Sequence, residues 1–141
     1  MARVHLALPE RFDFTTSIDV RLTDMNYGGH MGNEMVLAYA HEARDRFFRS
    51  LGYSELDVEG CSIIMADAVV VYRSEVFAGD RLNVHIGLTD FNKYGCDVVY
   101  RFDSENAGRE AARAKTGIVF YDYEARRIAH APERFLARFG Q

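Results

Sequence analysis

The segment from Asn33 to Leu51 limits most strongly what this chain can fold into, because it contains no Gly or Pro. At about 100° per residue, its apolar side chains, Val36 and Phe47 among them, fill well over half of the helical circumference. Such a wide apolar face belongs to a helix that is enclosed on most sides. Gly52 follows at the place where a helix C-terminus is expected. The sequence therefore predicts one long helix buried within a domain.

Segments with strand patterns surround this helix. Phe12–Leu22 alternates apolar and polar residues, which predicts a strand with one wet face. Beyond the helix, Ile63–Phe77 is apolar on both faces and predicts a central or interface strand. Three further strands are expected at Arg81–Thr89, Cys96–Phe102 and Glu110–Tyr123, separated by short turns. We therefore expect an α+β fold, with one long helix packed on a five-stranded antiparallel sheet whose last four strands form a meander.

Length and charge exclude several classes of protein. The chain has 141 residues, the size of one domain, so we expect a single domain over residues 1–141. Its net charge is −4 and its longest basic run is Arg126–Arg127, so nucleic acid is not an expected partner. The most apolar run already contains Asp67, and neither a membrane span nor a signal peptide is indicated. These features predict a cytoplasmic protein without a membrane partner.

The spacing of potential metal ligands indicates no metal site. Cys61 and Cys96 lie far apart and form no CxxC pair, which predicts reduced core thiols. The segment from His41 to Asp45 begins like a zincin helix, but an Asp stands where the second His would be required. Phosphate-binding loops and the serine-hydrolase motif are absent from the sequence as well. We therefore expect neither a cofactor nor a metal.

Polar residues that could carry chemistry are concentrated just before the long helix. Asp24, Asn26 and His30 lie in a loop with three glycines, which permit tight turns and a close approach of the backbone to a ligand. Each polar residue also has a structural interpretation. Asp24 suits a hydrogen-bonded turn, and Glu34 is a favourable charge at a helix N-terminus. Glu42, further along the helix, is one turn from Arg46 and suits an ion pair.

The loop and helix together resemble the hot-dog-fold acyl-CoA thioesterases of the 4-hydroxybenzoyl-CoA thioesterase type. That family's signature is Asp-x-Asp, a short gap, Gly-His, an Asn before the long helix, and Glu-Ala-Arg within the helix. The matching positions in this chain are Asp24, Asn26, Gly29-His30, Asn33 and Glu42-Ala43-Arg44. A later group resembles the family's second strand and turn: Ala66-Asp67-Ala68, Tyr72, Glu75 and Gly79-Asp80. The resemblance implies the hot-dog fold and hydrolysis of an acyl-CoA or acyl-carrier thioester.

The resemblance also implies how the loop takes part in the reaction. It assigns the backbone N–H of Asn33 as the donor that stabilises the oxyanion of the thioester carbonyl. Gly29, His30 and Met31 are expected to bind the substrate, with their backbone shaping the pocket. Asp67, an isolated charge in an apolar strand, is expected to accept hydrogen bonds or to line the cleft near a dimer interface.

The chain departs from the family at the residue that matters most for hydrolysis. Asn26 replaces the second Asp of the signature, which in many relatives is the base or nucleophile. An amide can do neither at neutral pH, although it can position a water or the thioester carbonyl. Another carboxylate must then assist the water, and Asp24 or Glu42 is the expected catalytic residue.

The same residues leave two alternatives to thioester hydrolysis. Asp24 and Asn26 with His30 nearly match the Asp-x-Asn-Pro-x-His motif of hot-dog enoyl-CoA hydratases, but no Pro follows Asn26. The missing carboxylate at position 26 also makes a non-catalytic acyl-CoA-binding protein a second alternative.

The proportions of the fold predict an assembly. One helix is too narrow to cover five strands, so we expect a homodimer or tetramer that packs through the strand Ile63–Phe77.

Overall fold

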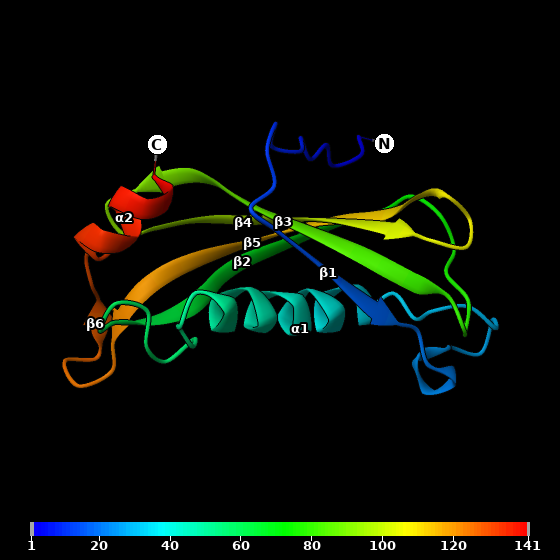
Figure 1. The fold of residues 1–141 in the computed structure, drawn as a ribbon, viewed down its shortest axis with the longest axis horizontal. Helices are drawn as coiled ribbons and strands as arrows, with labels where there is room; N and C mark the ends of the chain where they lie inside the picture. Colours follow the sequence, from blue (N-terminus) through cyan, green and yellow to red (C-terminus); the bar gives the residue numbers. More distant parts are fainter. Residues whose placement is uncertain (1, 141) are drawn as a thin grey trace.

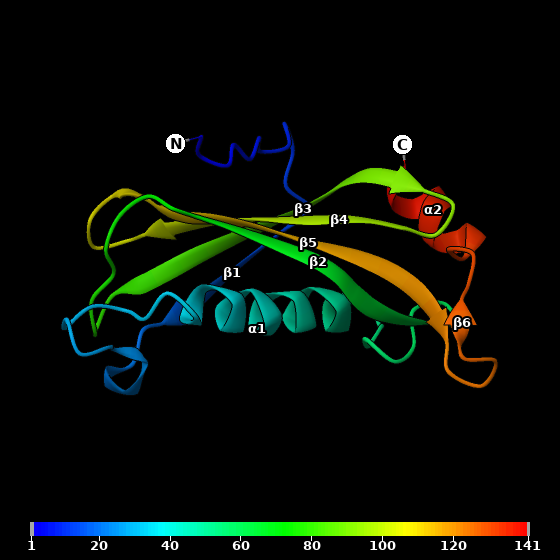
Figure 2. The same ribbon diagram turned by 180° about the vertical axis from the view of Figure 1, so that it is seen from behind.

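The computed structural model describes residues 2–140, in which one long helix lies across an antiparallel sheet. In chain order the elements are β1 (Phe14–Asp19), the short 3-10 helix η1 (Leu22–Asp24), α1 (Met35–Ser50), β2 (Ser62–Tyr72), β3 (Arg81–Asn92), β4 (Gly95–Ser104), β5 (Arg109–Asp122), β6 (Arg127–Ile128) and α2 (Glu133–Phe139). Figures 1 and 2 show α1 along one face of the curved sheet and the N-terminal segment on the other side. Helix α2 lies at one end of the sheet, where its Phe139 packs against Phe47 of α1 with ring centroids 6.0 Å apart.

Helix α1 confirms the prediction of a long, largely enclosed helix to within two residues at each end. Its sheet-facing side chains are buried, and they are Val36, Tyr39, Ala40, Ala43, Phe47 and Phe48. Gly52, at a φ of 80°, ends the helix and donates its N–H to the carbonyl of Arg49 at 3.0 Å. A positive φ costs glycine little, so this residue lets the chain turn directly into the next segment.

The five long strands pair in the order β1-β3-β4-β5-β2, all antiparallel. The prediction of one helix on a five-stranded antiparallel sheet is therefore confirmed, with the two-residue β6 added beside β5. The predicted four-strand meander is wrong, because only β3, β4 and β5 follow one another across the sheet. The segment between β2 and β3 bonds instead to the chain that precedes α1. The N–H of Met31 donates to the carbonyl of Val76 at 2.7 Å, and the N–H of Gly79 donates to the carbonyl of Val20 at 3.0 Å.

Strand β2 lies at an edge of the sheet and is shorter than the predicted strand Ile63–Phe77. It ends at Tyr72, because the next two residues, Arg73 and Ser74, both direct their N–H groups to the single carbonyl of Ala111. The middle of β2 is exposed in the single chain, so the prediction of a central strand is wrong for the single chain. Its interpretation as an interface strand stays a prediction.

Two elements that the sequence patterns did not predict cover other parts of the sheet. Pro9 of the N-terminal segment packs against Gly87, where a Cβ would lie 2.7 Å from the proline Cγ. Helix α2 begins after Pro132, whose φ of −59° suits the start of a helix. Its buried Phe135 packs edge-on against Phe120 with ring centroids 5.2 Å apart. Neither helix, within residues 2–140, is long and apolar enough to cross a membrane.

A buried polar network crosses the interior between α1 and the sheet. The guanidinium of Arg44, only 5% exposed, donates to Glu55 at 2.6 Å and to the hydroxyl of Tyr100 at 2.9 Å. Tyr100 in turn shares a hydrogen bond of 2.7 Å with Thr116. Burial raises the pKa of the Tyr100 phenol, so this group stays neutral at the centre of the network. The network fixes the rotation of α1 over β4 and β5.

Both cysteines are free thiols. Cys96 is buried on the inner face of β4, and burial raises the pKa of its thiol to about 12. Cys61 is partly buried, and its Sγ lies 3.7 Å from the carbonyl of Tyr121. The prediction of core thiols is confirmed for Cys96, and Cys61 lies at the border of the core.

Candidate active site

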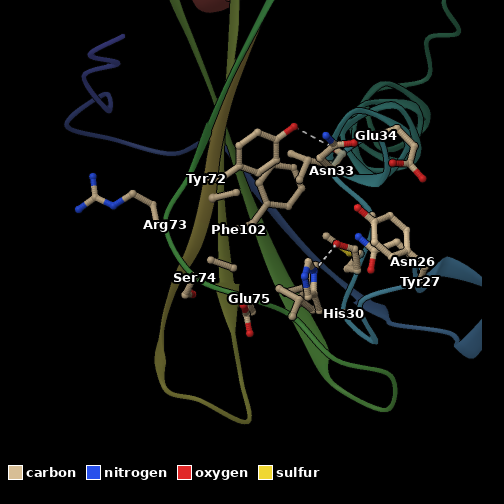
Figure 3. Close-up of a pocket in the computed structure, with 17 residues that line it drawn as sticks. Asn26, Tyr27, His30, Asn33, Glu34, Tyr72, Arg73, Ser74, Glu75 and Phe102 are labelled. Carbon is tan, nitrogen blue, oxygen red and sulfur yellow. Dashed lines mark hydrogen bonds between the residues drawn. The ribbon is translucent and has the colours of Figure 1, made fainter. Parts of the chain in front are cut away.

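A cavity of about 540 Å³ opens between the beginning of α1 and the inner face of the sheet. This volume suits a small-molecule ligand. Its apolar wall consists of Val36, Val76, Leu82, Phe102, Ala111 and Ala112. The polar residues that line it include Asn26, His30, Asn33, Glu34, Arg73, Ser74 and Glu75, and Figure 3 shows them around the rings of Tyr72 and Phe102.

The loop before α1 is held in a tight turn by Asn26. Its Oδ1 accepts the N–H of Gly28 at 2.9 Å, and its own N–H bonds to the carbonyl of His30 at 2.9 Å. Gly29 closes the turn with an N–H bond of 3.1 Å to the Asn26 carbonyl and a φ of 80°, which strongly favours glycine. The amide oxygen of Asn26 thus stabilises the loop, while its NH₂ group has no hydrogen-bond partner within residues 2–140.

Main-chain hydrogen bonds attach this loop to both of its neighbours. Besides the Met31 bond to Val76, the N–H of Gly32 donates to the carbonyl of Asp24 at 3.1 Å. From the other wall of the cavity, the hydroxyl of Tyr72 donates to the carbonyl of Asn33 at 2.9 Å (Figure 3). His30 is half-buried and its Nδ1 lies 3.3 Å from the Met31 carbonyl. The cavity therefore has a fixed backbone frame.

Two backbone N–H groups lie directly before α1, in residues that line the cavity. Neither Asn33 nor Glu34 has a hydrogen-bond partner for its backbone N–H within the described residues. Both residues line the cavity, at the end of the helix where the backbone dipoles favour negative charge. Chemically, this arrangement can stabilise an oxyanion that develops on a ligand carbonyl.

Asp24 lies behind the loop rather than in the cavity. Its carboxylate is buried and accepts a short hydrogen bond from the hydroxyl of Tyr39 and a 3.3 Å bond from the N–H of Arg21. Burial, together with this carboxylate, raises the pKa of the Tyr39 phenol well above its usual range. Tyr39 therefore remains a donor, and Asp24 is engaged in holding the loop to α1.

Two other sequence-predicted residues also lie outside the cavity of the single chain. Glu42 is half-exposed on α1 and pairs with Arg46 at 2.8 Å. Asp67 lies on the opposite face of the sheet and accepts bonds from the Nζ of Lys115 at 2.8 Å and the N–H of Gly117 at 3.0 Å. The hydrogen bond from Lys115 lowers the pKa of Asp67. The structure brings together Asn26, His30, Met31 and Asn33, with Gly29 in the same loop.

Sequence reasoning missed the second wall of the cavity. Residues Tyr72 to Glu75 were included in a predicted strand, whereas they end β2 and form the loop that faces α1. A signal was present, because Arg73-Ser74-Glu75 interrupts the apolar run with three polar residues. Within residues 2–140, no three His, Cys, Asp or Glu side chains gather as a metal site.

The chain from residue 20 to residue 139 matches the model of the thioesterase-like superfamily. This protein belongs to that superfamily. The hot-dog fold is confirmed, and the prediction of an acyl-CoA thioesterase is confirmed at the level of the family. Among curated proteins the sequence has no significant match.

Several solved structures, thioesterases among them, share the fold of this superfamily member. A 1,4-dihydroxy-2-naphthoyl-CoA thioesterase from Synechocystis has a TM-score of 0.80 at 22% identity, covering 91% of this chain and 96% of that one. A Staphylococcus aureus protein solved in complex with CoA has a TM-score of 0.80 at 20% identity, with 95% and 85% covered. A DHNA-CoA thioesterase from the same species has a TM-score of 0.74 at 19% identity, with 89% and 81% covered.

Proposed function

We propose that this protein hydrolyses an acyl-CoA thioester to the free acid and CoA. The observation that carries the proposal is the backbone N–H of Asn33, which has no partner within the described residues and belongs to a residue that lines the cavity just before α1. Thioester hydrolysis passes through a tetrahedral oxyanion, and preorganised backbone donors are the groups that stabilise such a charge. Superfamily membership and the CoA complex of a structural neighbour support the same substrate class.

Each part of the cavity would bind a different part of the substrate. The acyl group would lie against the apolar wall around Phe102, with the thioester carbonyl at the N–H of Asn33. The NH₂ group of Asn26 would position the carbonyl or the attacking water, and His30 would complete this polar side. Asp24 and Glu42 are the carboxylates expected from the sequence to assist water, although each has a protein partner and neither lines the cavity.

The pantetheine and nucleotide of the bound CoA would extend out of the cavity through the opening beside Arg73. Figure 3 shows the side chain of Arg73 extending away from the other lining residues. Its guanidinium forms no ion pair within residues 2–140, so it is available to a phosphate group at the opening.

We further propose that the working form is a homodimer, or a tetramer built from it, formed through β2. The inner-face side chains of this edge strand are left uncovered by α1: Met65 is 39% exposed, Ala68 is exposed and Tyr72 is 56% exposed. A free strand edge next to uncovered apolar side chains favours association with a second copy. Because β2 ends in the cavity wall, the partner would lie close to the site.

Purified protein incubated with acetyl-, hexanoyl- and benzoyl-CoA tests the proposed activity. We expect release of free thiol from at least one of them, without added metal and undiminished by a chelator. Loss of absorbance from an enoyl-CoA, without thiol release, would instead favour the hydratase alternative suggested by Asp24, Asn26 and His30. Binding of acyl-CoA without either reaction would favour the non-catalytic alternative, and both outcomes would contradict hydrolysis.

A further inference from the structure

Glu34 is one of only two glutamates that line the cavity, and it follows Asn33 directly. Its carboxylate folds back over Gly32, where a Cβ would lie 2.7 Å from Oε2 and closer still to Oε1. Only glycine at position 32 leaves this space to the carboxylate. Figure 3 shows Glu34 beside Asn33 at the beginning of α1, so its side chain leaves the chain one residue after the Asn33 N–H.

Unlike the carboxylates of Asp24 and Glu42, that of Glu34 has no protein partner among the described residues. Within residues 2–140 it accepts no hydrogen bond and forms no ion pair. Asp24 by contrast is held by Tyr39, and Glu42 by Arg46. A carboxylate that is already paired loses those interactions when it takes up a proton, whereas an unpaired one does not. Glu34 is therefore better suited than either to exchange a proton with water.

The second glutamate of the cavity has a less suitable position. Glu75 follows β2 in the loop opposite α1, and Figure 3 shows it beside His30 rather than beside Asn33. A general base must reach a water molecule close to the carbonyl carbon, and that carbon is located by the oxyanion donor. The donor expected here is the N–H of Asn33, so the position of Glu34, next to Asn33 in the chain, favours it over Glu75.

We propose that Glu34 is the general base of the hydrolysis, in place of the carboxylate that Asn26 lacks; this inference rests on the proposed function. The Glu34 carboxylate takes a proton from water as the water oxygen bonds to the thioester carbonyl carbon. The carbonyl electron pair moves to oxygen, where the Asn33 N–H stabilises it. When the C–S bond breaks, the proton passes from Glu34 to the thiolate, which gives the free acid and CoA thiol. Glu34 is neutral while the oxyanion exists, so two negative charges are not held side by side.

The test measures kcat for thiol release with the acyl-CoA that the natural protein hydrolyses best. Glu34→Gln keeps the size and polarity of the side chain but removes the base, and we expect kcat to fall about 100-fold or more. Glu133→Gln is the matched control, because Glu133 is likewise an acidic residue at the beginning of a helix but does not line the cavity. The control should keep the natural kcat, and both variants should melt only slightly below the natural protein.

A second variant moves the carboxylate without removing it. Gly32→Ala places a methyl group where the Glu34 carboxylate lies, and position 32 has no positive φ, so the backbone accepts alanine. We expect kcat to fall at least about 10-fold with an unchanged melting temperature, because only the end of a flexible side chain must shift.

The outcomes separate this proposal from the proposed function. If the natural protein releases thiol and Glu34→Gln keeps its kcat, the role of Glu34 is refuted while hydrolysis stands. A 100-fold loss in Asp24→Asn or Glu42→Gln, with Glu34→Gln unaffected, would assign the base to that residue instead. If the natural protein releases no thiol from any acyl-CoA, the proposed function fails and the role of Glu34 fails with it.

Discussion

Replacing Asn33 by proline tests the oxyanion donor directly, because proline removes a single backbone N–H. Within the described residues that N–H has no hydrogen-bond partner, so its loss breaks no internal bond. Position 33 also lies outside α1, so a proline there interrupts no helical hydrogen bond. The preceding residue is Gly32, which has no Cβ to clash with the proline ring. Asn33→Pro should therefore fold and retain the Tyr72 bond to its carbonyl.

The expected loss follows from the chemistry of the donor. Removing one oxyanion donor typically lowers kcat about 100- to 1,000-fold, or about 3 to 4 kcal/mol of transition-state stabilisation. Asn33→Ala is the control, because it removes the side chain and keeps the N–H. Thiol release gives kcat, and circular dichroism on heating confirms that both variants fold. Equal kcat values for Asn33→Pro and Asn33→Ala, with equal melting temperatures, would refute the assignment of this N–H as the donor.

Three further predictions concern the rest of the molecule. Arg44→Ala should lower the free energy of unfolding in urea by about 1 to 3 kcal/mol, because it removes a buried donor to the Tyr100 hydroxyl and to the partly exposed Glu55; a loss below about 0.5 kcal/mol would contradict the structural role of the network. Arg73→Ala should raise KM for an acyl-CoA by about 10-fold while leaving KM for the corresponding pantetheine thioester unchanged, and equal effects on both substrates would exclude a phosphate contact. Ala68→Lys should convert a dimer to a monomer in light scattering, and a natural protein that is already monomeric at micromolar concentration would overturn the proposed assembly.

The sequence predicted the elements that local pattern determines. The helix Asn33–Leu51 was identified correctly because its apolar side chains recur with helical period and Gly52 ends it. The paths of the strands across the sheet depend on long-range pairing, which local pattern does not contain. The pairing of β2 with β5 rather than β3 was therefore missed. Helix α2 was missed for a related reason, since Phe135 is explained only by its contact with Phe120 in the folded chain.

The same difference between local pattern and long-range packing separates the site residues that were predicted from those that were not. Asn26, His30 and Asn33 are neighbours in sequence, so one dense loop predicted all of them, and the structure places them on one cavity. Glu42 and Asp67 were chosen from residue type and family position, but the direction of each side chain depends on the packing of α1 and β2. Glu34 was assigned to helix stabilisation because its contact with Gly32 appears only in three dimensions.

Tyr72 connects the free edge of the sheet to the candidate site. It is the last residue of the free edge strand, and its hydroxyl is bonded to the carbonyl of Asn33. Any partner that orders β2 therefore also orders the carbonyl next to the expected oxyanion donor, and the reverse holds for a ligand in the cavity. Thermodynamic linkage requires the two effects to be equal in free energy. Affinity for an acyl-CoA should consequently rise with protein concentration through the range in which the chains associate.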